Sequence, residues 1–288
     1  MTTRPRRSVL YMPGVNARAL EQAKSVAADA LILDLEDSVA AETKVEARGR
    51  IAAAVASGAY GRRELIIRIN GLDTPWGVDD LKMAAEASPH AVLVPKVARP
   101  GDIVNVSRIY GAMSGSSSTR MWAMMETPMA IFNVREIASV HEVARLSCLV
   151  LGTNDLLKES RARATGGRFA ILPWLSMSLL AARAYGLDVI DGVYNDFRDE
   201  AGFRAECEQG RTLGMDGKTL IHPDQVATCN EVFSPAPEEV IWSRKIIAAF
   251  ALPENAAKGV ITVEGRMVER LHLAMAERVV SIAEAIAQ

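Results

Sequence analysis

The sequence predicts an α/β protein built around a (β/α)8 (TIM) barrel, for two reasons. Strand-like apolar runs alternate with helix-like stretches at intervals of about 25–35 residues, the spacing of repeated βα units. Five of these runs also end in a side chain that can ionise or bind a metal; they are LILDLED (31–37), LIIRIN (65–70), VLVPK (92–96), MWAMME (121–126) and LVLGTND (149–155). The carboxyl ends of barrel strands meet at one mouth, where such proteins carry their chemistry. The pattern therefore indicates an enzyme with a charged pocket.

Eight strands are expected, each short, apolar and followed by a turn or a helix-like stretch. They are residues 7–13, 30–36, 64–70, 90–96, 120–126, 146–152, 187–192 and 215–221. An open doubly wound sheet would alternate in the same way, but it would normally carry a GxGxxG turn after its first strand. The sequence there is MPGVNAR, so the closed barrel is favoured. A barrel of about 250 residues leaves part of the 288-residue chain for an extension.

Several of the helix-like stretches begin with residues that favour helix starts. Asn16 can cap the first helix, Ser38 can cap the Ala-rich helix that runs toward Ser57, and Thr127–Pro128 can open another. Residues 159–170 (ESRARATGGRFA) lack helical periodicity, and we expect them to form a loop on the catalytic face.

The domain organisation is expected to be a barrel at residues 1–234 followed by a C-terminal helical extension at residues 235–288. The extension contains two amphipathic stretches, EEVIWSRKIIAAFA and GRMVERLHLAMAERVVSIAEAIA, outside the eightfold count. The second carries an apolar stripe that needs a partner surface. We expect the extension to act as a lid over a barrel mouth or to contact a neighbouring subunit.

The composition excludes several classes of function. Hydrophobic residues make up 49% and charged residues 24% of the chain, and the formal net charge of −2 gives no reason to expect nucleic acid or an anionic membrane as partner. No apolar stretch approaches the ~20 residues that span a bilayer, and SVLYM is too short for a signal-peptide core. Cys148, Cys207 and Cys229 show no metal spacing and are expected to be idle thiols. We expect a cytoplasmic protein.

Glu126 and Asp155 form the strongest candidate pair, because they end consecutive predicted strands. Adjacent strands lie about 4.8 Å apart, so the two carboxylates can share one hard cation. Mg²⁺ typically takes one or two protein carboxylates and leaves its other positions to water and substrate. Alternatively, each carboxylate caps the helix that follows it, as the sequence Thr153–Asn154–Asp155 would allow.

Arg68 lies inside an apolar strand, where an isolated charge is costly to bury without a partner. Its guanidinium suits a bidentate contact with a carboxylate or an enolate oxygen. Alternatively, or in addition, it forms a salt bridge with Glu36 or Asp37. Because strand side chains alternate, at least one of Asp34, Glu36 and Asp37 should point into the site or be buried.

The turn PGVNAR offers backbone N–H groups and Arg18 at a helix start, which suits a phosphate, although a simple turn and cap explains it as well. The four histidines show no ligand spacing, and a lone His222 is more often structural. The sequence contains no GxSxG, P-loop or zinc motif.

Eight motifs occur in one order: RSVLYMPG, ILDLEDSV, IIRIN, VPK, METP, LGTNDL, DGV and IHPDQV. Over roughly residues 6–270 the chain resembles the citrate lyase β-subunit-like branch of the HpcH/HpaI aldolases. That branch includes malyl-CoA lyases, citramalyl-CoA lyases and malyl-CoA thioesterases. The resemblance implies a barrel, a Mg²⁺ site (with Mn²⁺ as an alternative ion) and a coenzyme A (CoA) thioester substrate.

The resemblance also assigns roles to residues. It places the metal on Glu126 and Asp155, the substrate arginine on Arg68, and an acidic pair on Glu36 and Asp37. It places the CoA contacts on Pro13, Gly14, Arg18 and Lys24 after the first strand, and on Ile221, His222 and Pro223 after the last.

One position departs from the family pattern. Many relatives carry an aspartate after a G-x-M-[VI] segment on a lid lent by the adjacent subunit, whereas this chain reads GRMVE and places Glu269 there. The carboxylate is then one methylene further out, and a displacement of about 1 Å can cost about 100-fold in rate. The departure leaves the balance between C–C cleavage and thioester hydrolysis open.

The leading expectation is a Mg²⁺-dependent acyl-CoA lyase that cleaves malyl-CoA or citramalyl-CoA to acetyl-CoA and a 2-oxo acid, glyoxylate or pyruvate. Arg68 would stabilise the developing negative oxygen, and Asp37 or Glu269 would accept the hydroxyl proton. The alternatives are a malyl-CoA thioesterase, a citrate lyase β subunit acting on citryl-acyl carrier protein, and a non-catalytic CoA-binding or assembly subunit. The resemblance further implies a homo-oligomer, a trimer.

Overall fold

The computed structural model describes residues 4–163 and 166–288, which divide into two compact units. One unit is Arg6–Val232 and contains a closed barrel of eight parallel strands. The other unit contains Phe233–Gln288.

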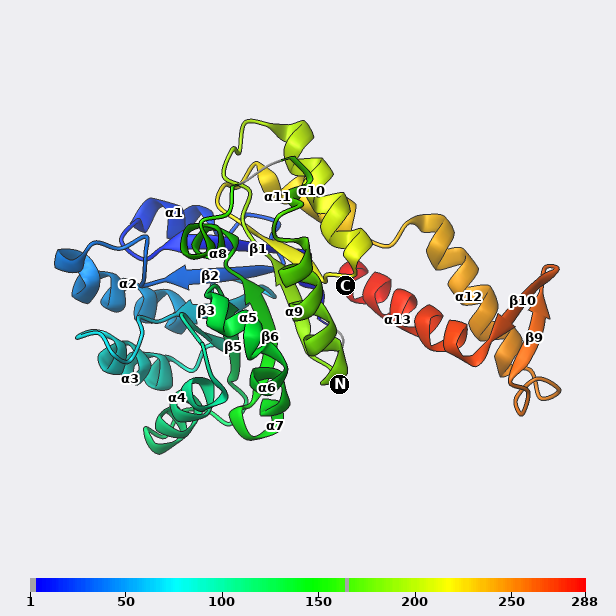
Figure 1. Cartoon of the computed structure of the whole chain (residues 1–288), viewed down its shortest axis with the longest axis horizontal. Coiled ribbons are helices and arrows are strands. Elements are labelled where there is room, and N and C mark those ends of the chain that lie inside the picture. Colours follow the sequence, from blue (N-terminus) through cyan, green and yellow to red (C-terminus); the bar gives the residue numbers. More distant parts are fainter. Residues whose placement is uncertain (1–3, 164–165) are drawn as a thin grey trace. The chain divides into compact units, whose positions relative to one another are not determined.

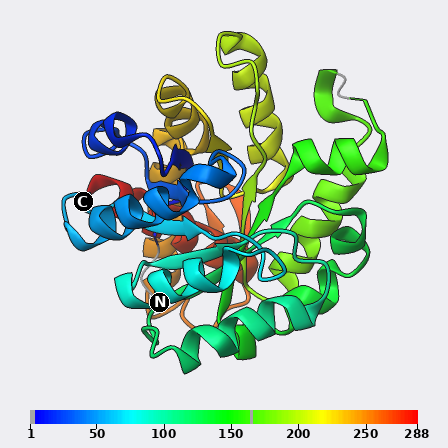
Figure 2. The ribbon, with the colours of Figure 1, turned by 90° about the vertical axis from the view of Figure 1, so that its left-hand side faces the viewer.

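Figure 1 shows the barrel strands surrounded by helices. The strands follow one another in chain order, and β1 closes the barrel by pairing with β8. The strands are β1 Ser8–Pro13, β2 Ala30–Asp34, β3 Glu64–Arg68, β4 Ala91–Val94, β5 Arg120–Met125, β6 Leu146–Leu151, β7 Asp188–Asp191 and β8 Gly217–Leu220. Figure 2 looks onto one end of the barrel, where helices surround the strands. The predicted barrel is confirmed, and each strand lies within the range expected from the sequence.

Helices connect the strands on the outside of the barrel. They are α1 Ala17–Gln22, α2 Lys44–Ala56, α3 Gly77–Ala87, α4 Pro100–Ala112, α5 Pro128–Phe132, α6 Val134–Ser139, α7 His141–Ala144, α8 Thr153–Ser160, α9 Leu172–Ala184, α10 Glu200–Leu213 and α11 Gln225–Phe233, with 3₁₀ turns η1 Ala41–Thr43 and η2 Gly166–Arg168. The Asn16 side chain accepts the N–H of Ala19, and the Thr127 side chain accepts the N–H of Ala130. The caps expected at Asn16 and Thr127 are confirmed.

The barrel interior is filled by side chains and is not a channel. Every second residue of a strand faces inward, and these residues form one apolar cluster contributed by β1 to β7: Val9, Ala30, Ile32, Ile66, Ala91, Leu93, Trp122, Met124, Cys148, Val150 and Ile190. Because this core is closed to water, polar chemistry is confined to the ends of the strands.

Two local expectations need correction. Ser38 does not cap a helix, because its hydroxyl and its N–H both donate to the buried carboxylate of Asp34, and α2 begins only at Lys44. The segment 159–170 is not entirely a loop, because α8 continues through Ser160 and η2 covers Gly166–Arg168. Residues 164 and 165 of that segment lie outside the described part of the chain.

The second unit consists of α12 Pro237–Ala251, a hairpin of β9 Val260–Val263 and β10 Arg266–Glu269, and α13 Arg270–Ala287. The expectation that GRMVE begins a helix is wrong, because these residues form the turn and second strand of the hairpin. Glu264 and Gly265 have φ of 48° and 78°, the left-handed conformations of a tight hairpin turn. The run of β-branched residues VITV before this turn was the signal of a strand. Among the described helices, none is long and apolar enough to cross a membrane.

Candidate active site

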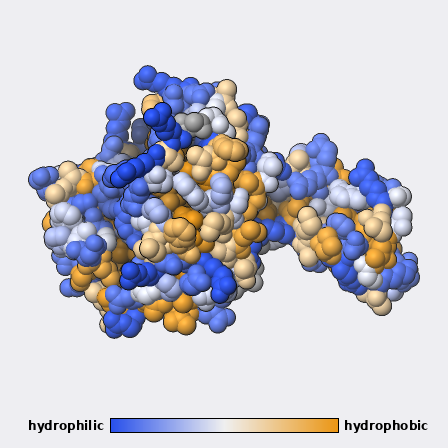
Figure 3. Space-filling view, viewed as in Figure 1, coloured by the Kyte–Doolittle hydropathy of each residue, from blue (hydrophilic) through white to orange (hydrophobic). Residues whose placement is uncertain are grey.

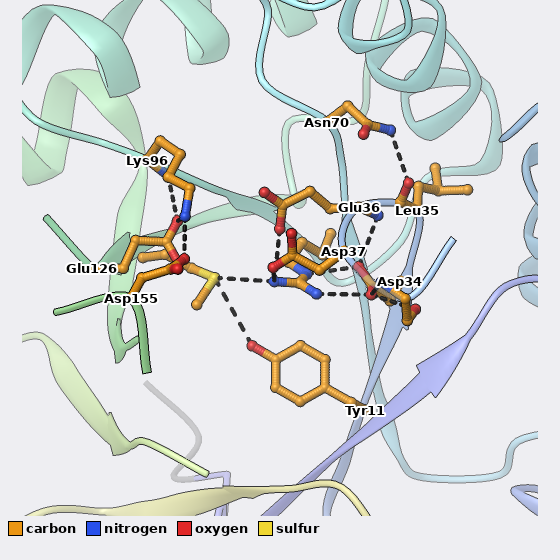
Figure 4. Close-up of polar contacts among 12 residues, drawn as sticks. Tyr11, Asp34, Leu35, Glu36, Asp37, Asn70, Lys96, Glu126 and Asp155 are labelled. Carbon is orange, nitrogen blue, oxygen red and sulfur yellow. Dashed lines mark hydrogen bonds and ion pairs between the residues drawn. The ribbon is translucent and has the colours of Figure 1, made fainter. Parts of the chain in front are cut away.

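Charged side chains complete the inward-facing rows of the barrel at its mouth. The row of β2 ends at Asp34, the row of β3 ends at Arg68, and Glu126 follows directly after β5. Asp34 and Arg68 are register partners on neighbouring strands. In Figure 4, Glu126 lies beside Lys96 and Asp155 on one side, and Asp34 lies with Glu36 and Asp37 on the other. The apolar rows below them provide the rigid support.

Arg68 is held by three carboxylates. Its Nε and Nη2 donate to the two carboxylate oxygens of Asp34 at 2.6 and 2.7 Å, a bidentate pair in which Asp34 is only 1% exposed. Its Nη1 forms an ion pair with Glu36 Oε2 at 2.7 Å and donates to Asp37 Oδ2 at 3.4 Å. The salt bridges expected from Arg68 to Glu36 and Asp37 are therefore present, and Asp34 adds a stronger one.

The acids around Arg68 differ in their proton affinity. Burial raises the pKa of Asp34, but the charge and hydrogen bonds of Arg68 outweigh burial, so this pKa lies below its usual value. Burial raises the pKa of Glu36 to about 7, because the attraction of Arg68 is opposed by Asp37 and Glu126. Glu36 can therefore exchange a proton near neutrality, whereas Asp34 stays a carboxylate.

Glu126 and Asp155 both contact the ammonium group of Lys96. Lys96 Nζ lies 3.6 Å from Glu126 Oε1 and forms an ion pair with Asp155 Oδ2. The backbone N–H of Lys96 donates to the same Glu126 oxygen at 2.6 Å. Lys96 has φ of 52°, a conformation that non-glycine residues rarely adopt. Three consecutive strands, β4 to β6, thus deliver one cation and two carboxylates to one point.

The donor set of Glu126 and Asp155 fits a hard divalent cation. Both side chains offer oxygen ligands, and one positive centre already lies between them. Burial raises the pKa of Glu126, with the attraction of Lys96 acting in the opposite direction. No group of three or more His, Cys, Asp or Glu within residues 4–163 and 166–288 is arranged to hold a metal. A cation here would therefore rely on two carboxylates, water and substrate, as Mg²⁺ commonly does.

The alternative role of Asp155 as a helix cap is not seen. The N-cap of α8 is Gly152, and Asp155 lies within the first turn of the helix. Its carboxylate is paired with Lys96. Asp155 is thus directed toward the mouth rather than toward the backbone of its own helix.

The residues expected to contact CoA lie after two neighbouring strands, β1 and β8. Pro13 ends β1, Gly14 is buried beside Asp34, and Arg18 is exposed on α1. Lys24 is paired with Glu21.

On the other side, the N–H groups of Ile221 and His222 donate to the side chain of Gln225, and the His222 ring stacks on Phe197 at 4.4 Å. Ile221 is 41% exposed. The two groups of residues expected to contact CoA therefore lie on either side of the pairing between β1 and β8.

Glu269 lies in the C-terminal unit. It is the last residue of β10 and the N-cap of α13. Its side chain accepts the N–H of His272, and His272 Nδ1 accepts the N–H of Glu269 at 2.9 Å, so the two residues cap each other. The catalytic role expected for Glu269 stays a prediction.

The structure adds Tyr11 to the site. Its ring lies over the Arg68 guanidinium, with 4.9 Å between Cζ and the ring centroid, and its hydroxyl points into the mouth (Figure 4). Tyr11 follows Val9 in the inward-facing row of β1. Tyr11 could have been identified from the sequence, because it lies two residues after the inward-facing Val9, near the end of β1. It was not predicted because only the charged residues at the strand ends were considered.

A cavity of about 520 Å³ that the sequence did not indicate is lined by Thr153 and Asn154, next to Asp155 in the first turn of α8. Its other walls include Tyr194, Asn195, Glu206 and Gln209. Residues from four stretches of the chain between Thr153 and Gln209 line this cavity, so no local pattern could have revealed it.

A buried charge cluster lies beside this cavity. Arg168 Nη1 donates to both oxygens of Asp191 at 2.7 and 2.8 Å, and Lys218 donates to Asp191 at 3.0 Å and to Glu206 at 2.6 Å. The two cations and two anions compensate one another in the interior.

A closed parallel barrel whose mouth holds an arginine and two carboxylates of a kind that suits a hard cation defines a class of TIM-barrel proteins suited to acidic substrates. The chain belongs to the HpcH/HpaI aldolase/citrate lyase family, whose model matches residues 7–223. The family predicted from the ordered motifs is thereby confirmed.

Individual relatives are similar over nearly the whole chain. The (3S)-malyl-CoA thioesterase of Cereibacter sphaeroides strain KD131 is 49% identical over 283 residues, which cover 98% of this chain and 96% of the relative. The L-malyl-CoA/beta-methylmalyl-CoA lyase of Cereibacter sphaeroides strain ATCC 17029 is 34% identical and covers 98% and 96%. The crystal structure of CitE from Mycobacterium tuberculosis with magnesium, acetoacetate and coenzyme A matches with a TM-score of 0.75 and 25% identity, over 99% of this chain and 98% of that one.

Proposed function

We propose that this protein is a Mg²⁺-dependent enzyme that hydrolyses the thioester of a malyl-CoA-type substrate. The observation that carries the choice of reaction is the 49% identity to a malyl-CoA thioesterase over 98% of the chain. From the sequence alone, the lyase is the leading expectation and the thioesterase an alternative, and the comparisons favour the reverse order. The acid-rich mouth with its arginine supports a substrate that carries negative charge.

Glu126 and Asp155 hold the cation in this proposal, and Mn²⁺ can replace Mg²⁺ because both accept oxygen ligands. When bound, the cation supplies a Lewis acid that orients the hydroxyl and carboxylate of the substrate. Lys96 contacts both carboxylates and limits their repulsion. CoA lies along the joint between β1 and β8, with contacts from Pro13, Gly14, Arg18, Lys24, Ile221 and His222.

Hydrolysis requires water to add to the thioester carbonyl carbon, after which the C–S bond breaks and the sulfur takes a proton. Arg68 stabilises the negative charge that develops on the carbonyl oxygen. Asp37 is the base that accepts the water proton, because its carboxylate is 66% exposed beside Arg68. Glu36, whose pKa is raised to about 7, can return a proton to the leaving thiolate. Asp34 keeps Arg68 in place.

The test is the purified protein with malyl-CoA, citramalyl-CoA and citryl-CoA as substrates, with and without Mg²⁺. Release of free CoA thiol and malate supports hydrolysis. Glu126→Gln and Asp155→Asn should each abolish Mg²⁺-dependent turnover with an unchanged far-UV circular dichroism spectrum. Near wild-type turnover by either variant at limiting Mg²⁺ contradicts the metal assignment, and metal binding without turnover of any CoA ester by the wild-type protein contradicts the enzymatic role.

A second candidate is C–C cleavage of the same substrate to acetyl-CoA and glyoxylate or pyruvate, supported by the 34% identity to a malyl-CoA lyase. The same residues would carry out C–C cleavage, because Arg68 would stabilise the enolate oxygen of acetyl-CoA. Detection of a 2-oxo acid before free thiol identifies the lyase, and thiol without a 2-oxo acid identifies the thioesterase. Activity on free CoA esters excludes a strict need for an acyl carrier protein.

We also propose that the protein is a homo-oligomer, a trimer, in which the C-terminal segment of one subunit covers the barrel mouth of the next. Exposed apolar side chains on each unit support a second copy as partner. On the barrel unit they gather over α5 and α9 (Figure 3); Met129, Phe132 and Leu180 are among them. On the C-terminal unit, Leu271 and Met275 are exposed one turn apart on α13.

Mixing Glu269→Gln subunits with Arg68→Ala subunits tests this sharing. If the lid crosses the interface, mixed oligomers regain activity, because some sites receive both intact residues. A lack of recovery after verified subunit exchange contradicts the shared site.

A further inference from the structure

Two hydrogen-bond donors at the barrel mouth are directed at one weak acceptor. Arg68 Nη1 donates to Met124 Sδ at 3.8 Å, and the Tyr11 hydroxyl donates to the same sulfur at 3.9 Å (Figure 4). A thioether is a poor acceptor compared with any oxygen. Across the described ranges, the Tyr11 hydroxyl has no other hydrogen-bond partner.

For the Tyr11 hydroxyl this arrangement is costly unless another acceptor enters, whereas Arg68 Nη1 also pairs with the carboxylates of Glu36 and Asp37. A phenol normally donates to an oxygen at about 2.7 Å, and a phenylalanine would fill the same space beside Arg68 without leaving a poorly paired hydroxyl. Met124 is 4% exposed and Arg68 is 6% exposed, whereas Tyr11 is only partly buried and faces the mouth. Burial raises the pKa of Tyr11, so the phenol keeps its proton at neutral pH and remains a donor.

We propose that Tyr11 and Arg68 form a two-donor seat for the thioester oxygen of the substrate, and that the Met124 thioether fills this seat until substrate displaces it. Met124 suits this role because its unbranched side chain has several rotatable bonds and can repack. The proposal rests on the proposed function, in that it requires a CoA thioester. It assigns Tyr11 a direct contact with the reacting group.

The position of Tyr11 in the barrel identifies the oxygen. Tyr11 belongs to β1, the strand that leads into the Pro13–Gly14 turn proposed to hold CoA. Glu126 and Asp155, which would hold the acyl end through the cation, follow β5 and β6. The thioester links these two ends of the substrate, so its carbonyl oxygen lies between them.

The same oxygen becomes negative in either candidate reaction. It carries the charge when water adds to the carbonyl carbon, and it carries the charge of the enolate when the C–C bond breaks. Fixed donors aimed at such an oxygen stabilise the transition state more than the bound substrate. Tyr11 only donates a hydrogen bond and keeps its proton throughout.

Tyr11→Phe tests the proposal, because it removes one oxygen and keeps the ring on Arg68. We expect kcat for malyl-CoA to fall about 100-fold, KM to rise by no more than about 3- to 10-fold, and the thermal unfolding midpoint to stay the same or rise. The matched control is Tyr110→Phe, since the Tyr110 hydroxyl donates to Thr119 Oγ1 at 2.9 Å within a fully buried part of α4. This control should lower the unfolding midpoint and leave kcat unchanged. A Tyr11→Phe variant with kcat within about 3-fold of wild type overturns the proposal.

Binding measurements separate this inference from the proposed function. Calorimetry should compare acetyl-CoA with S-ethyl-CoA, a thioether that lacks the carbonyl oxygen. We expect Tyr11→Phe to weaken acetyl-CoA binding by about 3- to 10-fold, the contribution of one hydrogen bond, and to leave S-ethyl-CoA binding unchanged. Equal weakening of both ligands overturns the contact with the carbonyl oxygen while leaving CoA binding intact. If wild-type protein binds neither ligand, the proposed function fails and the inference fails with it.

Discussion

Glu126 occupies the space that a side chain at Gly152 would need. A Cβ on Gly152 would lie 2.4 Å from Cβ of Glu126 and 2.9 Å from its Oε2. The two residues follow the register partners Met125 and Leu151 at the ends of β5 and β6. The chain thus has a glycine directly after β6, at the level of the mouth, and the Glu126 side chain, which follows β5, lies across that position.

Gly152→Ala should therefore displace Glu126 and weaken divalent metal binding by about 10- to 100-fold, a loss typical of disturbing the residues that orient a metal ligand. Titration with Mn²⁺ followed by electron paramagnetic resonance measures this affinity directly. Gly49→Ala, in the exposed middle of α2 with no atom within 4 Å of the new Cβ, is the matched control and should leave affinity unchanged. Unchanged Mn²⁺ affinity in Gly152→Ala would show that Glu126 does not need this space.

Arg68→Lys should lower kcat/KM by at least about 100-fold, because a point charge cannot reproduce a bidentate contact with Asp34 and reach the substrate as well. Steady-state kinetics measures the loss, and Arg204→Lys, at an exposed ion pair with Glu231, serves as the control. Full activity in Arg68→Lys would reduce Arg68 to a structural role.

Glu36 should make folding stability depend on pH. Its pKa of about 7 lies above the ordinary carboxyl value, so between about pH 4.3 and pH 7 the native state binds more protons than the unfolded state. The free energy of unfolding therefore falls as pH rises through this window.

Glu36→Gln removes this contribution, so its stability relative to wild type should increase from pH 5 to pH 8. Urea unfolding in the presence of EDTA measures it, with the exposed Glu142→Gln as control. A pH-independent difference between Glu36→Gln and wild type would contradict the raised pKa.

The buried cluster beside the α8–α10 cavity should matter for stability. Lys218 and Asp191 are both fully buried, and Lys218→Met leaves a surplus of negative charge in the interior. We expect a loss of about 3–5 kcal/mol in the free energy of unfolding. In the double variant Lys218→Met/Asp191→Asn, the loss should be smaller than the sum of the two single losses, because the charges are removed together. Additive losses would contradict a coupled cluster.

The fold could be predicted from the sequence because its signals are local. Each barrel strand is an apolar run of ordinary length, and caps such as Asn16 and Thr127 act within three residues. The charged ends of β2 to β6 were identifiable for the same reason. Their contacts with Arg68 and Lys96 follow from strand order in a barrel.

What escaped prediction depends on contacts between distant residues or on turn geometry. Ser38 binds the Asp34 carboxylate in place of a helix backbone, and only the folded loop shows which acceptor is nearer. The hairpin before Glu269 was taken for a helix because the apolar residues of RMV also fit a helical stripe. The contact between Tyr11 and Met124 joins β1 to β5, on opposite sides of the barrel, and neither strand's sequence alone indicates it.

The joint between β1 and β8 has a consequence for synthesis of the chain. Ser8 pairs with Lys218, and the Lys218 N–H donates to the carbonyl of Arg7, so the first barrel strand meets the last barrel strand to be synthesised. While the ribosome is still adding the intervening segments, one edge of β1 has no partner within the barrel. An open edge of this kind can recruit strands from other chains. The nascent chain is therefore most exposed to misassembly until β8 emerges, and slow translation just before Gly217 would lengthen that period.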